Sequence, residues 1–132
     1  MDKNKVIEFL KQSSGVGDIE EIQYKSEILV LRFFYDYDKD ELEAAKDYAN
    51  GKTNADDSED VWYDEHFTPY IIDIAVDEVR DTLEELVDST GLNVEYINYE
   101  PDRDDESCEF IAVFADEGKE FDIDKILESM DK

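Results

Sequence analysis

The stretch ILVLRFFY, residues 28–35, is apolar at nearly every position. A strand with one face in water alternates apolar and polar residues, whereas a strand that is covered on both faces does not. These residues therefore predict a strand that is buried on both faces, or one that holds a face against a partner. This strand decides the fold, because the rest of the chain must cover it.

A helix and a strand are expected before this stretch. Residues 3–12 place apolar side chains on one helical face, and Asp2 can cap the helix start. Gly15 and Gly17 break the helix. A strand over residues 19–24 then pairs with residues 28–35 across a short turn.

A second helix is expected to begin after the apolar stretch. Asp38 and Glu41, three residues apart, form a variant of the capping box. Tyr37 and Leu42 occupy the two positions of a hydrophobic staple. Gly51 suits the end of this helix.

The longest helix is expected over residues 68–90. Thr68 is suited to the N-cap, Pro69 to the first helical position and Gly91 to the end. One face of this helix is apolar and carries Ile72, Ala75, Val76, Val79, Leu83, Leu86 and Val87. The preceding residues 51–68 are expected to form an acidic loop.

Strands over residues 92–99 and 108–115 and a helix from Asp122 complete the pattern. The predicted fold is a single α+β domain, residues 1–132, with about four antiparallel strands packed against helices. Residues 3–50 and 77–131 both follow the order helix, strand, strand, helix. Residues matched at an offset of 80 include Val30 with Phe110, Leu31 with Ile111, Phe34 with Phe114 and Asp36 with Asp116.

Two explanations account for this match. One is an internal duplication that produced two αββα units. The other is that any two units of this order align about as well.

The charge of the chain is its most unusual property. The sequence has 39 acids and 13 bases, for a net charge of −26. Residues 1–35 carry 6 acids and 5 bases, so the acidity belongs to the remainder of the domain. Such a charge disfavours direct nucleic-acid binding and anionic membranes, and it favours a basic protein partner. A halophilic source would also account for it.

The compartment is expected to be the cytoplasm. No stretch has the length and apolarity of a membrane span, and the first residues lack the apolar core of a signal peptide. Cys108 is the single cysteine, which suits a reducing compartment and a buried thiol.

The outward face of the helix over residues 68–90 is a candidate partner surface. Arg80 is the single base on this helix, whereas solvated helices usually alternate both signs of charge. Acids four apart lie about 6 Å apart along a helix axis, which loosely resembles the spacing of phosphates. The candidate residues are Asp73, Asp77, Asp81, Glu84, Glu85 and Asp88. The alternative is a solvated face without a partner.

A group of aromatics is the second candidate surface. Trp62, Tyr63 and Phe67 stand among acids, and aromatic anchors within a polar rim are typical of binding hot spots. The alternative is that they cover the sheet as a lid.

The sequence predicts neither catalysis nor a cofactor. His66 is the single histidine, and nothing in the sequence pairs it with a nucleophile. Asp36, Asp38 and Asp40 have the spacing of calcium ligands, but the glycine and glutamate that complete such a loop are missing.

Two classes of function fit these properties. The first is a non-enzymatic acidic protein that engages a basic partner, as an inhibitor, an immunity-type protein or a nucleic-acid mimic. The second is an acidic chaperone or adaptor that forms a homodimer and holds a polypeptide. The apolar stretch at residues 28–35 would suit the second class if one of its faces met a partner.

Overall fold

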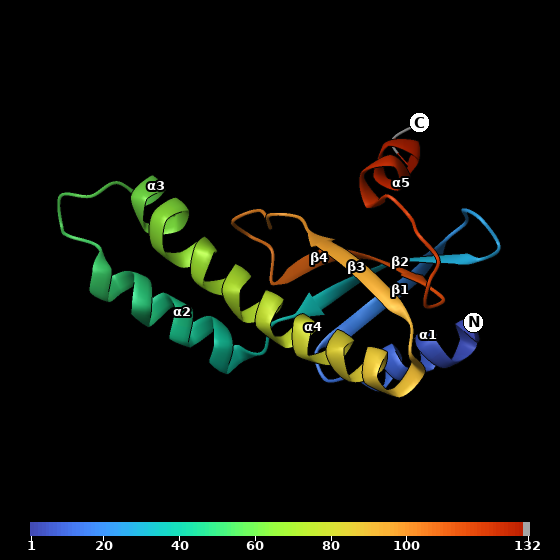
Figure 1. Cartoon of the computed structure of the whole chain (residues 1–132). Coiled ribbons are helices and arrows are strands. Elements are labelled where there is room, and N and C mark those ends of the chain that lie inside the picture. Colours follow the sequence, from blue (N-terminus) through green and yellow to red (C-terminus); the bar gives the residue numbers. More distant parts are fainter. Residues whose placement is uncertain (131–132) are drawn as a thin grey trace.

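The computed structural model describes residues 1–130, which form a sheet with helices on both of its faces (Figure 1). The elements in chain order are α1 (Lys3–Lys11), β1 (Val16–Ile22), β2 (Ile28–Asp36), α2 (Lys39–Lys52), α3 (Glu59–Val61), the π-helix η1 (Trp62–Phe67), α4 (Thr68–Thr90), β3 (Asn93–Asn98), β4 (Ser107–Ala115) and α5 (Ile123–Met130).

The four strands form one antiparallel sheet in the order β1-β2-β4-β3. The central pair, β2 and β4, runs in continuous register from Ile28 opposite Ala115 to Asp36 opposite Ser107. These are the two most apolar strands, and the centre of a sheet is where both faces can be covered. The predicted α+β class and the four-stranded antiparallel sheet are confirmed.

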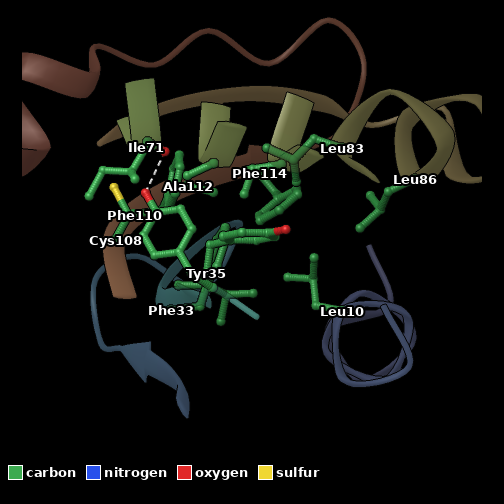
Figure 2. Close-up of a cluster of buried hydrophobic side chains, with 14 of the residues drawn as sticks. Leu10, Phe33, Tyr35, Ile71, Leu83, Leu86, Cys108, Phe110, Ala112 and Phe114 are labelled. Carbon is green, nitrogen blue, oxygen red and sulfur yellow. Dashed lines mark hydrogen bonds between the residues drawn. The ribbon is translucent and has the colours of Figure 1, made fainter. Parts of the chain in front are cut away.

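One face of the sheet forms the main core with α1, α2 and α4. Every second residue of β2 and β4 points to this face, including Phe33 and Phe110, whose rings stack 5.6 Å apart. Leu10 of α1 and Leu83 and Leu86 of α4 approach from the helices (Figure 2).

The other face of the sheet is partly covered by α5. Val30 and Ile111 pack there against Ile126, which is 1% exposed. The apolar stretch at residues 28–35 is thus explained by burial on both faces within the chain. Farther along this face, Arg32 forms an ion pair with Glu109 and is only half-buried.

The start of α2 is confirmed in detail. Glu41 donates its backbone N–H to the Asp38 side chain at 2.7 Å, and the Glu41 side chain accepts the backbone N–H of Asp38 at 3.0 Å. The expected end at Gly51 is wrong, because the helix continues to Lys52 and Thr53 caps it.

The start of the long helix differs from the expectation. Thr68 is not the N-cap of a helix: it has helical dihedral angles and is 4% exposed. Helical structure begins at Glu59, where the Ser58 side chain accepts the N–H of Val61, and it runs through η1 into α4. The acidic loop is therefore shorter than residues 51–68. The expected end is confirmed, because Gly91 takes the left-handed conformation with φ 74°.

The two halves share the order helix, strand, strand, helix, but their strands do not match as the alignment requires. A duplication would relate β2 to the antiparallel β4 by a two-fold axis perpendicular to the sheet. Such an axis places each residue and its match on the same face of the sheet. At an offset of 80, however, Leu31 in the main core matches Ile111 on the other face, and Val30 and Phe110 are exchanged likewise. In addition, α2 packs in the main core and α5 on the opposite face. The strand match therefore does not support a duplication, which stays a hypothesis based on element order.

None of the helices within residues 1–130 combines the length and the apolar character that a membrane crossing requires.

Candidate functional site

Five exposed acids form a line along the outer face of α4. The buried residues of this helix, including Ile71, Ala75, Val79 and Leu83, recur every three or four positions and fix which side meets the sheet. Positions opposite that side therefore point to solvent. We name the resulting line the α4 stripe, and its members are Asp73, Asp77, Asp81, Glu84 and Asp88.

The α4 stripe is nearly free of compensating charge. Asp77 pairs with Arg80 at 3.1 Å, and both side chains are largely exposed. Within residues 1–130, no other member of the stripe takes part in an ion pair. Like charges one helical turn apart repel each other by a few tenths of a kcal/mol per pair. The stripe is thus a mildly unfavourable feature of the folded protein.

Glu85 is separated from the other predicted acids of this helix. It is exposed, but it lies toward α1, beside a shallow hollow that Phe9 and Ser13 also line. The structure therefore brings five of the six predicted acids onto one line and places the sixth on the flank.

The predicted aromatic surface is largely an internal contact. Trp62 stacks on Phe67 at 4.9 Å, and its indole N–H donates to Asn50 of α2 at 2.8 Å. Phe67 is 5% exposed, and Trp62 and Tyr63 are half-buried against the main core. These residues join α2 to the helical segment before α4, so they offer a partner less surface than an exposed patch.

The turn between β3 and β4 covers one side of these aromatics. Arg103 lies over the ring of Tyr63 at 4.9 Å and donates hydrogen bonds to Asp60 at 2.7 Å and Asp64 at 3.3 Å. This contact neutralises part of the acidity around the aromatics, and it leaves the α4 stripe as the larger unpaired surface of the two candidates.

Two of the groups that chemistry could use, Asp38 and Cys108, are occupied or buried. Asp38 is engaged in the capping box, and His66 lies in η1 rather than in a loop. Burial raises the pKa of the Cys108 thiol to about 11, so it stays protonated near neutral pH. Among residues 1–130, no three His, Cys, Asp or Glu side chains are grouped so that they could hold a metal ion.

A groove between α4 and β3 was missed by sequence reasoning. It has a volume of about 500 Å³, and we name it the β3 groove. It is lined by Arg80, Leu83, Glu84, Val87, Asp88, Leu92, Asn93, Val94 and Tyr96. No sequence signal indicates it, because it depends on β3 lying at the edge of the sheet.

Comparison with protein-family models, with curated proteins and with solved structures found no match to this chain.

Proposed function

We propose that this protein is a non-enzymatic acidic binding protein that engages a basic protein through the α4 stripe. The observation that carries the proposal is the stripe itself, which is five exposed acids on a 23-residue helix with a single base among them. An amphipathic helix needs polar residues on its outer face, but it does not need residues of one charge.

The charge of the whole chain supports the same role. A net charge of −26 attracts a basic partner over distances of about a Debye length and speeds the encounter. It also repels nucleic acid and anionic lipid, which leaves basic protein as the macromolecule that the field favours. Proteins that bind nucleic acid are a common source of basic surfaces.

An inhibitor, an immunity-type protein or a nucleic-acid mimic would use such a stripe to occupy a basic site. The stripe alone is sparser than duplex DNA, which carries one charge per about 1.7 Å of axis. Mimicry would therefore also use the acids near residues 56–60 and 102–106. A reducing compartment such as the cytoplasm suits a protein with a single buried thiol.

The alternative of a homodimeric chaperone or adaptor loses its main sequence argument. That argument required one face of residues 28–35 to meet a partner, and α5 and the main core cover most of this stretch. The alternative therefore enters as an outcome of the test.

The test is a pull-down with two variants of equal charge change. The stripe variant carries Asp73→Asn, Asp81→Asn, Glu84→Gln and Asp88→Asn, and it keeps Asp77 because that residue is paired. The control variant neutralises four exposed acids elsewhere, by Asp47→Asn, Glu117→Gln, Glu120→Gln and Glu128→Gln, and it keeps Glu43 because that residue pairs with Lys39. Each bait is washed at low salt and then at high salt, and eluted proteins are identified by mass spectrometry.

The proposal expects one basic protein that the wild type and the control variant retain at low salt and release at high salt. The stripe variant should not retain it. Recovery that resists salt, or that both variants share equally, would contradict the proposal and favour the chaperone or adaptor alternative.

A further inference from the structure

We infer that β3 accepts an extended segment of a basic partner as a fifth strand, with the apolar side chains of that segment in the β3 groove. This inference rests on the proposed function for the charge of the partner. Its binding mode is argued from the sheet edge and the groove, and it uses the backbone of β3, although Glu84 and Asp88 of the α4 stripe also line the groove.

Within residues 1–130, the outer backbone edge of β3 is not paired with another strand. The N–H of Tyr99 donates to Glu109 of β4, which sets the alternation of the antiparallel ladder. It follows that Val94, Tyr96 and Asn98 direct their backbone N–H and C=O groups away from β4. Each of them can therefore give an added strand one donor and one acceptor.

The opposite edge of the sheet is less suitable. The ladder of β1 is interrupted between Gly17 and Glu20, where Asp18 takes a positive φ of 52°. Such bulges and charges protect an edge from pairing. The ladder of β3 with β4 continues without interruption from Asn93 to Asn98.

The β3 groove supplies the pockets that a strand partner needs. The side chains of Val94 and Tyr96 face the main core, on the same side of the sheet as α4, whose C-terminal half runs beside β3 (Figure 1). Val87 is half-buried at the groove, so its apolar surface remains accessible. In strand addition, the backbone supplies affinity and alternate side chains in pockets supply specificity.

Charge decides between the occupants. Glu84 and Asp88 lie on the groove and Glu95 is exposed on β3, whereas Arg80, the base on the groove, is already paired with Asp77. A second copy of the chain carries its own net charge of −26, so it would be repelled at this edge. A basic extended segment relieves the repulsion instead, with apolar residues at alternate positions and basic residues between them.

The geometry predicts which amides of such a segment pair with β3. The added strand is antiparallel to β3, as every strand pair of this sheet is, so residues directly opposite Val94 and Tyr96 exchange hydrogen bonds with them and point their side chains to the same face. The apolar residues of the segment must therefore donate their own N–H groups to β3. The N–H groups of the basic residues point to solvent.

The probe is a synthetic nine-residue peptide in which valine alternates with lysine, with blocked ends. One version is N-methylated at every valine and another at every lysine. Binding is measured by titration, and the amide signals of the ¹⁵N-labelled protein are followed by NMR. We expect the amides of Val94, Tyr96 and Asn98 to shift and to become protected from hydrogen exchange.

N-methylation at valine should weaken binding by about tenfold or more, whereas N-methylation at lysine should change it by less than about threefold. On the protein side, Val94→Pro removes an outward N–H and should weaken binding similarly. The sheet should stay folded, because proline is tolerated at edge positions whose N–H faces solvent. Asp73→Asn with Asp81→Asn, which lie outside the groove, serves as the control.

Three results would overturn the inference. They are equal binding of both methylated peptides, shifts confined to Asp73, Asp77 and Asp81, which lie outside the groove, or β3 signals that change with protein concentration alone, which would make a second copy the occupant. Failure here would leave the stripe proposal standing, because that proposal is tested by the stripe variant. Failure of the pull-down would leave the peptide result unaffected.

Discussion

The hydroxyl of Tyr37 donates a hydrogen bond to the backbone carbonyl of Ile71, 2.5 Å away. Tyr37 stands between β2 and α2, and Ile71 lies in the first turn of α4, so this bond joins segments that are 34 residues apart. Tyr37 is 8% exposed, and its hydrogen bond to Ile71 is buried. The contact helps to hold α4, and with it the stripe, against the sheet.

Tyr37→Phe should therefore lower the free energy of unfolding by about 1 kcal/mol, since it removes the buried hydrogen bond to Ile71 and the contact of the hydroxyl with the Cys108 thiol. The measurement is urea unfolding followed by circular dichroism. Tyr48→Phe is the matched control, because Tyr48 is 42% exposed and should stay within about 0.5 kcal/mol of wild type. Equal effects of the two substitutions would show that the Tyr37 bond does not stabilise the fold.

Ile126→Ala tests whether α5 covers the second face of the sheet. The side chain is 1% exposed and packs on Val30 and Ile111, so its truncation should cost about 2–5 kcal/mol. Glu128→Ala on the exposed side of α5 should change stability by less than about 0.5 kcal/mol. A loss below 1 kcal/mol for Ile126→Ala would mean that α5 is not docked on this face.

Alkaline pH should destabilise the protein. Burial raises the pKa of the Cys108 thiol to about 11, whereas a free thiol has a pKa of about 8.5. Between these values the unfolded chain releases the proton and the folded chain keeps it, so the free energy of unfolding falls as pH rises. Burial also raises the pKa of Tyr35 and Tyr37, which acts in the same direction above pH 10.

The corresponding measurements are urea unfolding at pH 8 and pH 10 and the reaction rate of Cys108 with a thiol reagent. We expect lower stability at the higher pH and a thiol that reacts only after unfolding. Rapid reaction of the folded protein at pH 8 would contradict the burial of Cys108.

Local signals in the sequence predicted helix ends where a few neighbouring residues determine the backbone conformation. The capping box of Asp38 and Glu41 and the glycine at position 91 both act within a few residues, and both were predicted correctly. The prediction that Thr68 caps the helix was wrong. A threonine followed by proline favours a helix start locally, but packing against the core lets helical structure begin earlier and run through Thr68. α2 continues past Gly51 because Thr53 caps it, donating its backbone N–H and its hydroxyl to the carbonyl of Ala49.

Long-range features were beyond the sequence. The six acids of the long helix could be predicted from periodicity, but the position of Glu85 on the flank depends on where α1 packs. The burial of Phe67 depends on α2, and the β3 groove depends on the strand order. A sequence with two similar hairpins does not indicate which of its strands lie at the edges.

The stripe variant should be more stable than wild type at low salt. It removes repulsion between like charges along α4 without touching the buried face, so the gain should be about 0.5–1 kcal/mol from several pairs. In 1 M NaCl the gain should nearly vanish, because the Debye length falls to about 3 Å. Thermal unfolding at both salt concentrations measures this. A loss of stability would mean that the stripe acids stabilise the fold. Their presence would then be explained without a binding partner.

The most direct measurement of the central claim is the affinity for the recovered basic partner as a function of salt. It is measured by titration calorimetry for the wild type, the stripe variant and the control variant. We expect a wild-type affinity that falls steeply as NaCl rises, a control variant that behaves likewise, and a stripe variant that is weaker at low salt and less sensitive to salt. Equal affinity of wild type and stripe variant at every salt concentration would contradict the claim that the α4 stripe binds the partner.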